Sequence, residues 1–198
     1  MQITDFGIII LAAGSSSRLG QPKQLLMCKN KTLLQHAIDE ATAISDCLVI
    51  VVVGAKKDEI VSKIHFSSAQ FIDNKNWSEG MSSSIRIGLS ALIKENPSLH
   101  SVIIMLCDQP FVSSQLLQQI REAEASSDKG IVASFYKETA GVPALFTSKY
   151  FEQLLSLQGN EGAKKIVMLN GDDVATVPFP LGLVDIDTMQ DYADFQSR

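Results

Sequence analysis

Two cationic side chains lie in a small-residue segment near the N-terminus, a pattern typical of an anion-binding loop. The segment IIILAAGSSSRLGQPKQLL, residues 8–26, starts as an apolar run and continues with Gly14, Ser15, Ser16, Ser17, Arg18 and Lys23. Gly14 permits backbone angles that other residues avoid. Small side chains let backbone N–H groups approach an anion, and Arg18 and Lys23 add positive charge. The segment predicts phosphate binding, although an ordinary mobile surface loop would have a similar composition.

Two aspartates are candidates for binding a divalent cation. Asp108 directly follows the apolar run SVIIMLC, and Asp187 lies in VDIDT, ahead of a helical pattern at the C-terminus. Magnesium in proteins is held by one or two carboxylates together with phosphate oxygens. Each aspartate also has a purely structural interpretation, because Asp108 could cap a turn and Asp187 precedes a box-like helix start at Thr188 and Asp191. Asp185 would lie on the same face as Asp187 in an extended segment.

The elements that must position these residues alternate along the chain. Apolar runs suited to buried strands occur at 6–13, 47–54, 69–73, 101–107, 129–134 and 143–147. Amphipathic patterns typical of helices occur at 32–44, 81–93, 113–125, 161–169 and 188–196. Alternating strands and helices predict a three-layer α/β fold around a mainly parallel sheet.

Polar segments follow several of the expected strands. In an open parallel sheet, ligands bind outside the carboxyl ends of the strands. The segments at those ends are GSSSRLGQPK, NKNWSEGMSSS and DQPF. Neither a G-x-G-x-x-G fingerprint nor a G-x-x-x-x-G-K-[ST] phosphate loop occurs, so the usual dinucleotide and P-loop sites are not predicted.

Length and composition exclude several classes of protein. The chain has 198 residues, of which 45% are hydrophobic, and a formal net charge of -5. This favours one globular domain over residues 1–198 and gives no reason to bind a nucleic-acid polymer or a membrane. Its apolar runs are far shorter than the roughly 20 residues of a membrane span. Cys28, Cys47 and Cys107 are few and widely spaced, as expected for buried thiols in a reducing cytoplasm.

The first loop resembles that of a known enzyme family. Leu11 to Lys23 fit the pattern L-A-A-G-x-S-x-R-x-G-x-P-K, which is similar to the signature of nucleotidyltransferases that activate small phosphorylated molecules with an NTP. The resemblance implies a Rossmann-like sheet of the nucleotide-diphospho-sugar-transferase type. It also implies that Arg18 and Lys23 contact the triphosphate, with Lys23 near the reacting α-phosphate, and that Mg²⁺ is held by Asp108 and Asp187.

Further segments resemble the molybdenum cofactor cytidylyltransferase family. They are WSEGMSSSIRIGL, CDQPF, GVPALF, GNEGAKKIVM and VDIDTMQDY. The resemblance implies transfer of CMP from CTP to the phosphate of molybdopterin, with release of pyrophosphate. The product would then serve a molybdenum hydroxylase of the xanthine dehydrogenase type. Guanylyl relatives typically read L-A-G-G where this chain reads L-A-A-G, so the resemblance favours CTP over GTP.

The same resemblance assigns roles to individual residues. The nucleotide would be bound by Leu11, Ala12, Ala13, Gly14, Ser15, Ser16, Ser17, Arg18, Lys23, Gly80 and Ser84, and the acceptor by Gln109, Pro110, Gly141, Pro143, Phe146 and Gly162. Some of these residues have structural alternatives, since serines at a helix start often act as caps and Phe146 could be a core residue. Likewise, Trp77 could line the pocket or cover the core. The chain departs from the family at Asn160 and Lys164, where Asp and Arg are usual.

Three hypotheses follow. The first is a molybdopterin cytidylyltransferase that needs no strong general base, because a phosphate monoester is already largely ionised. The second is another CTP- or GTP-using nucleotidyltransferase, acting on a sugar phosphate or methylerythritol phosphate. The third is a nucleotide-binding or cofactor-carrier module without catalysis. In each case His36, His65 and His100 are expected at the surface rather than as catalytic bases.

Overall fold

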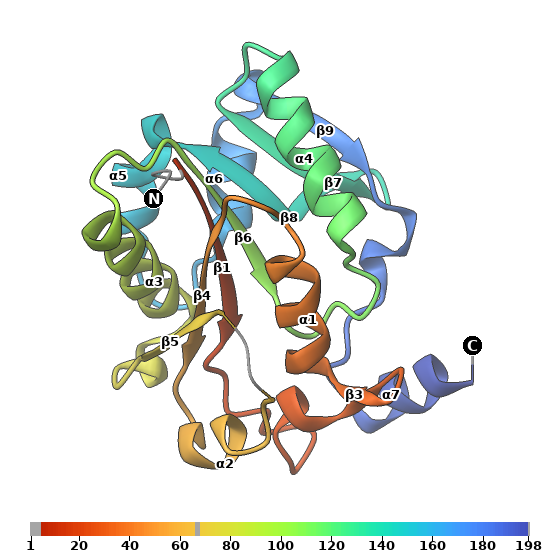
Figure 1. Ribbon diagram of the computed structural model, residues 1–198. Coiled ribbons are helices and arrows are strands. Elements are labelled where there is room, and N and C mark those ends of the chain that lie inside the picture. Colours follow the sequence, from red (N-terminus) through yellow and green to blue (C-terminus); the bar gives the residue numbers. More distant parts are fainter. Residues whose placement is uncertain (1–4, 66–67, 198) are drawn as a thin grey trace.

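The fold is a sheet covered by helices on both faces (Figure 1). The structure is a computed structural model that describes residues 5–65 and 68–197. Within them, seven strands form one sheet in the order β5-β4-β1-β6-β8-β7-β9. Their bounds are β1 (Phe6–Ala12), β4 (Leu48–Val53), β5 (Gln70–Asp73), β6 (Ser101–Leu106), β7 (Ile131–Tyr136), β8 (Thr139–Thr147) and β9 (Val174–Pro178). Only β8 runs antiparallel to its neighbours among these strands, so the prediction of a mainly parallel sheet is confirmed.

Helices cover both faces because the central strands are apolar on both sides. In β1, Ile8 and Ile10 face one core cluster, whereas Ile9 and Leu11 face the other. The first cluster is covered by α1 (Leu33–Thr42), α2 (Lys57–Val61) and α4 (Ser114–Ser126). The second is covered by α3 (Met81–Glu95), α5 (Phe151–Leu155) and α6 (Ala163–Leu169). This explains why the strands are continuous apolar runs rather than alternating ones.

One strand and two helices whose sequences show little apolar periodicity were not predicted. The strand β9 is an edge strand with one buried residue, so it has little apolar periodicity to detect. Both α2 and α5 have five residues, which is too short for a helical repeat to be visible. The segment 143–147 was expected as a strand of its own, but it is the second half of the longer β8.

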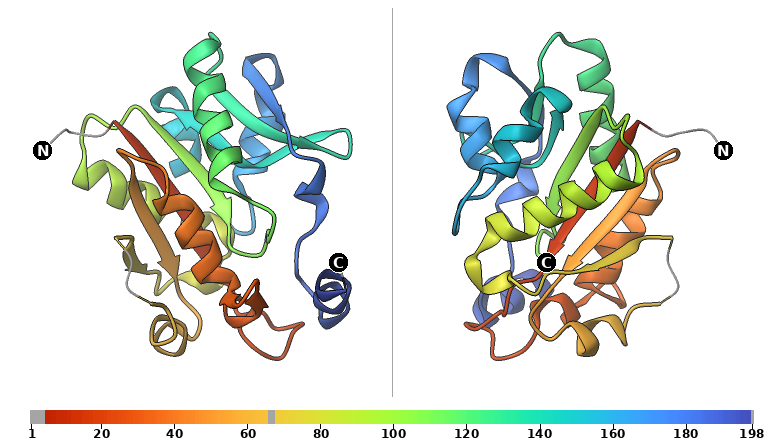
Figure 2. Two further views of the ribbon diagram at one scale, coloured as in Figure 1. Left: turned by 45° about the vertical axis from the view of Figure 1, so that its right-hand side comes forward. Right: turned by 90° about the vertical axis from the view of Figure 1, so that its left-hand side faces the viewer.

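A small third core fixes the first loop against the C-terminal segment. Leu19, Leu26, Cys28, Leu33 and Ile186 form this cluster, with Tyr192 and Phe195 packed against it. The last two belong to α7 (Met189–Gln196), which lies beside the short hairpin of β2 (Met27–Cys28) and β3 (Lys31–Thr32) (Figures 1 and 2). Because Leu19 is buried there, the first loop is held in place, in contrast to the alternative of a mobile surface loop.

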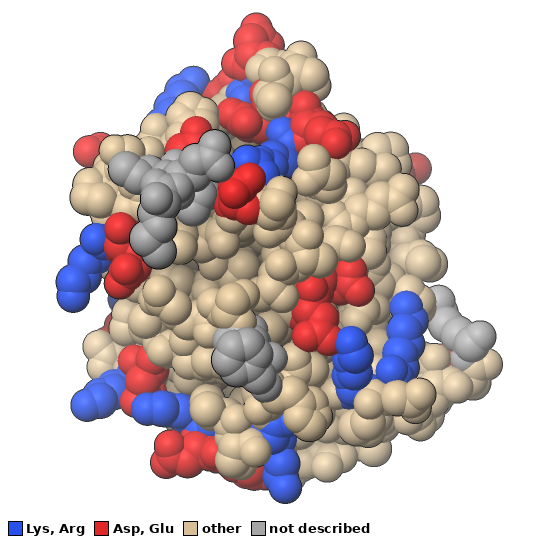
Figure 3. Space-filling view, viewed as in Figure 1, with Lys and Arg blue, Asp and Glu red and all other residues tan. Residues whose placement is uncertain are grey.

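The charges on the surface are mixed and the cysteines are at least partly buried, as the composition led us to expect. On the face shown in Figure 3, basic and acidic side chains are interspersed and separated by wide uncharged areas. None of the described helices is long and apolar enough to cross a membrane. Cys28 and Cys107 are buried and Cys47 is partly buried. Burial raises the pKa of Cys47 and Cys107 to about 12, so these thiols are unreactive near neutral pH.

Candidate active site

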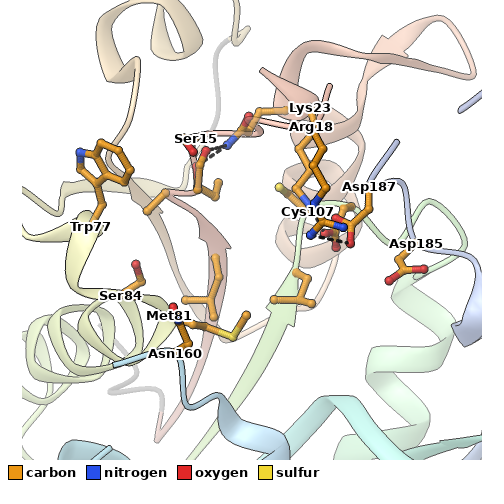
Figure 4. A pocket seen from close by; sticks show the side chains of 18 of the residues that line it. Ser15, Arg18, Lys23, Trp77, Met81, Ser84, Cys107, Asn160, Asp185 and Asp187 are labelled. Carbon is orange, nitrogen blue, oxygen red and sulfur yellow. Dashed lines mark hydrogen bonds and ion pairs between the residues drawn. The ribbon is translucent and has the colours of Figure 1, made fainter. Parts of the chain in front are cut away.

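A cavity of about 600 Å³ opens at the carboxyl ends of β1 and β6. Its walls come from the loop after β1, the start of α3, the residues after β6, and the segment 185–187. In Figure 4, Lys23, Arg18 and Asp187 lie together at one end, and Trp77 and Ser84 lie at the opposite end. The cavity therefore has one charged end and one largely uncharged end.

The charged end is organised by Lys23. Its Nζ atom donates to Asp108 Oδ2 at 2.5 Å and to Asp187 Oδ1 at 2.7 Å. Burial alone would lower the pKa of the Lys23 ammonium, but the charge and hydrogen bond of Asp108, with the hydrogen bond of Asp187, raise it above its ordinary value. Lys23 is therefore a permanent cation between the two carboxylates that the sequence selected.

The segment that carries Asp187 is fixed from both sides. The backbone N–H of Ile186 donates to the Asp108 carbonyl at 3.1 Å. A capping box follows, in which Thr188 and Asp191 satisfy each other's backbone N–H groups at the start of α7. Arg18 reaches Asp187 at 3.7 Å, while its own side chain stays mostly exposed. The sequence offered a catalytic and a capping interpretation of this segment, and the structure combines a helix cap with an aspartate turned into the cavity.

The two carboxylates fit a divalent cation. Asp108 Oδ1 is buried and has no hydrogen-bond partner among the described residues, so one oxygen remains available to a ligand. Asp185 also lines the cavity, and burial, with the charges of Asp108 and Asp187, raises the pKa of its carboxyl group. Three or more His, Cys, Asp or Glu side chains do not converge into a metal site anywhere in the described residues. Further ligands would therefore be oxygens of substrate or water, as is usual for magnesium.

The uncharged end is bordered by residues of β1 and of the segment that leads into α3. Leu11, Ala12 and Ala13 border it, and Trp77 lines it while remaining partly exposed. Ser84 is buried, and its Oγ accepts from Asn74 Nδ2 at 2.9 Å. Among the described residues its hydroxyl donates to no other group, so the hydrogen is available to a ligand in the cavity.

Gly80 is required where α3 begins. Its φ is +112°, and a Cβ there would lie 2.3 Å from the Gly159 carbonyl oxygen. Both the backbone N–H and the Oγ of Ser82 donate to that same oxygen. These contacts bring Asn160 into the cavity wall next to Gly80, although the two are far apart in the sequence. A side chain at Gly80 would displace this part of the wall.

Several residues assigned by resemblance do not line the cavity. They are Ser16, Ser17, Gln109, Pro110, Gly141, Pro143, Phe146 and Gly162. Ser17 is exposed, and the hydroxyl of Ser16 turns towards Lys23 N. Phe146 is completely buried in the core cluster beside α3, so its side chain cannot contact an acceptor. The expected left-handed backbone occurs at Ser16, with φ +54°, rather than at Gly14.

The other acceptor candidates lie beyond the cavity wall. Gln109 Nε2 donates to the carbonyls of Val142 and Gly182, which places Gln109 beside Gly141 and Pro143. Gly162 begins α6 and leaves room for Met81, which does line the cavity. Their role towards an acceptor remains a prediction.

Sequence reasoning missed the burial of two polar side chains, Gln24 and His36. Gln24 lines the cavity wall and is fully buried, although a glutamine after a Pro-Lys pair gives no local signal of burial. His36 was expected at the surface but is buried, with its Nε2 3.0 Å from the Pro110 carbonyl oxygen. His36 therefore supports the segment after Asp108 and stays outside the cavity.

Comparisons with known proteins agree with this geometry. A family model described as "MobA-like NTP transferase domain" matches residues 8–174. Nicotine blue oxidoreductase from Paenarthrobacter nicotinovorans is 33% identical over 107 residues, covering 53% of this chain and 50% of that protein. The chain thus spans about half the length of this curated relative.

Solved structures share the whole fold. Rv0371c from Mycobacterium tuberculosis H37Rv is 25% identical, with a TM-score of 0.81 and 100% of both chains covered. A second structure of Rv0371c, 24% identical with a TM-score of 0.80 over 97% of this chain and 98% of that one, is a complex with manganese. Molybdopterin-guanine dinucleotide biosynthesis protein A from Archaeoglobus fulgidus is 17% identical, with a TM-score of 0.67 over 96% of this chain and 97% of that one. The last two likenesses concern the fold alone.

Proposed function

The chain belongs to the MobA-like NTP transferase domain family, and on that premise we propose that it transfers CMP from CTP to the phosphate of molybdopterin, releasing pyrophosphate. Residues 1–198 would form one nucleotidyltransferase domain. The observation that carries the proposal is the Lys23 ammonium between Asp108 and Asp187, at one end of a nucleotide-sized cavity. A carrier module without catalysis would have no need for a cation and two carboxylates at the phosphate end.

The chemistry is an in-line displacement at the α-phosphorus. An oxygen of the acceptor phosphate forms the new P–O bond, and the bond to pyrophosphate breaks. Lys23 and Arg18 would stabilise the negative charge that develops on the transferred group and the leaving pyrophosphate. The walls of the cavity would hold the two reactants in line, so positioning would act together with charge stabilisation. Magnesium, when held by Asp108 and Asp187, would supply further charge neutralisation.

The uncharged end offers hydrogen-bonding groups to a base. Ala13, which borders it, is 6% exposed and packs its Cβ towards Gly54. The Ser84 hydroxyl and the amide of Asn160 can form hydrogen bonds with a base or with the acceptor. The resemblance of residues 11–14, L-A-A-G, to the cytidylyl rather than the guanylyl relatives favours cytosine. The product would pass to a molybdenum hydroxylase of the xanthine dehydrogenase type.

Pyrophosphate release tests the reaction. The purified chain would be incubated with Mg²⁺, molybdopterin and either CTP or GTP. The proposal predicts rapid release with CTP and at least about tenfold slower release with GTP, a difference of about 1.4 kcal/mol in the barrier. Release with methylerythritol phosphate or a sugar phosphate, but not with molybdopterin, would assign the site to another acceptor. Nucleotide binding without any release would indicate a carrier.

The Lys23→Met variant tests the assigned chemistry. Turnover should fall by about 10²–10³, the loss typical of removing one charge-stabilising donor. CTP binding should weaken much less, because the base and ribose contacts remain. Trp77 is the only tryptophan of the sequence and lines the cavity, so quenching of its fluorescence can measure binding separately. Equal losses of turnover and binding would contradict a catalytic role for Lys23.

A further inference from the structure

Gln24 is an uncharged buried side chain whose amide contacts the first loop at three points. It follows Lys23 in the short 3-10 helix η1 (Lys23–Leu25) and has no exposed surface. Its Nε2 donates to the carbonyl of Ala12 at 2.8 Å and to that of Gly14 at 3.0 Å. Its Oε1 accepts from the hydroxyl of Ser16 at 3.4 Å. A buried amide is tolerated because its donors and its acceptor are satisfied in this way.

The hydrogen bonds of Gln24 with the carbonyls of Ala12 and Gly14 determine the direction in which the first loop points its backbone N–H groups. In a trans peptide, the N–H points opposite to the preceding carbonyl. Since the Gly14 carbonyl points to Gln24, the N–H of Ser15 points away from Gln24. That N–H has no hydrogen-bond partner in the part of the chain that the structure describes, and Ser15 lines the cavity. It is a free backbone donor at the phosphate end of the site.

The third contact reaches the catalytic lysine. The Ser16 hydroxyl that donates to Gln24 also accepts from the backbone N–H of Lys23 at 3.0 Å. Ser16 has a φ of +54°, a conformation that costs energy for a residue with a side chain and must be maintained by its surroundings. Gln24 and Ser16 together therefore fix both the loop backbone and the point from which the Lys23 side chain extends.

We propose that Gln24 is a positioning residue for the triphosphate: it aims the Ser15 N–H and Lys23 at the phosphates without contacting the reacting atoms. The inference rests on the proposed function, because it assigns the phosphate end of the same cavity. Gln24→Leu keeps most of the volume but leaves the carbonyls of Ala12 and Gly14 without their donor. Gln24→Glu keeps the shape and can still accept from Ser16, but it places a carboxylate against those carbonyls.

The test separates positioning from stability by means of a matched control. Gln35 is also buried, and its side chain makes two hydrogen bonds outside the cavity, one with Asp39 and one with the His65 backbone, where that of Gln24 makes three. Gln24→Leu, Gln24→Glu and Gln35→Leu would be compared with wild type by melting temperature and by quenching of Trp77 fluorescence with CTP plus Mg²⁺. Displacement of CTP by inorganic triphosphate plus Mg²⁺ would isolate the phosphate contribution.

The expected result is a selective loss of phosphate binding. Both Gln24 variants should bind triphosphate at least tenfold more weakly and lose about 10²-fold in kcat/KM, since a misplacement of about 1 Å can cost that much. Gln35→Leu should lower the melting temperature by a similar amount and leave triphosphate binding unchanged. Wild-type triphosphate affinity in both Gln24 variants would overturn the inference while leaving the nucleotidyltransferase proposal intact. Failure of wild type itself to bind CTP or triphosphate would overturn both.

A second variant covers the case in which Gln24→Leu fails to fold. Ser16 is only partly buried, so Ser16→Ala should fold, and it removes the same connection from its other end. Ser16→Ala should also weaken triphosphate binding, by a smaller factor than Gln24→Leu. If Gln24→Leu does fold, the double variant should lose less than the product of the two single losses, because both residues act through one connection. Unchanged binding in Ser16→Ala, or strictly multiplicative losses, would contradict the inference.

Discussion

The Lys23→Met substitution should destabilise the protein in a way that a divalent cation reverses. The side chain of Lys23 is 17% exposed and that of Asp108 is 11% exposed, so their 2.5 Å pair is largely removed from water. Removing one partner of a buried pair costs about 3–5 kcal/mol, because the remaining charge stays buried. Asp187 adds little to this cost, since its side chain is 37% exposed and water screens its charge.

We therefore expect a loss near the lower end of that range, about 3 kcal/mol, because the cavity is open to water. At about 2–4 °C per kcal/mol for a chain of this size, the melting temperature should fall by about 6–12 °C. A cation that binds the folded state stabilises it by mass action. With Lys23 absent, Asp108 and Asp187 are free to bind such a cation, so millimolar Mn²⁺ or Mg²⁺ should restore much of the loss.

The assay is thermal unfolding of metal-free wild type and variants, with and without Mn²⁺. Lys31→Met is the matched control, because Lys31 pairs with Asp39 at the same 2.5 Å but its side chain is 53% exposed. That variant should be destabilised far less than Lys23→Met, because solvent screens an exposed ion pair, and it should not respond to Mn²⁺ beyond wild type. The reasoning would be refuted if Lys23→Met were as stable as Lys31→Met, or if Mn²⁺ stabilised wild type and Lys23→Met equally.

Two further predictions concern the backbone at α3 and an ion pair far from the cavity. Gly80→Ala should lower the free energy of unfolding by about 1–3 kcal/mol, because φ is +112° and the new Cβ would collide with the Gly159 carbonyl; it should also weaken CTP binding. Urea unfolding measures the first effect and quenching of Trp77 fluorescence the second. Unchanged stability would contradict the geometry. Asp173→Asn should cost about 1 kcal/mol near pH 6, because hydrogen bonds from Lys149 and Tyr150 lower the pKa of Asp173 to about 2 and solvent screens the exposed Lys149. Because the pKa of Asp173 is lower in the folded state, its carboxylate stabilises that state above the unfolded pKa of about 4, and this stabilisation is lost as the pH falls towards 2. The difference in melting temperature between wild type and Asp173→Asn should therefore shrink between pH 5 and pH 2. A constant difference would refute this assignment.

The strands and the first loop could be predicted from the sequence because their signals are local. Continuous apolar runs identify β1, β4 and β6, since a strand covered on both faces needs apolar residues at every position. Asp108 follows such a run directly, so its place at a carboxyl end was predictable. Lys23 and Arg18 were selected because they add positive charge to a loop of small residues that resembles the signature of nucleotidyltransferases. These inferences depend on neighbours within a few positions of each residue.

The tertiary structure decided which of these residues meet. Lys23 contacts Asp108 and Asp187, which are 85 and 164 positions away in the sequence, and no local pattern encodes those distances. Phe146, assigned to the acceptor by resemblance, is instead enclosed by the second core, because the face of β8 on which it lies is covered by helices. The burial of Gln24 was decided in the same way, since a polar side chain is buried where backbone groups of another segment satisfy its hydrogen bonds. The sequence by itself determined the central strands and the cationic character of the first loop, and long-range packing determined which side chains line the cavity.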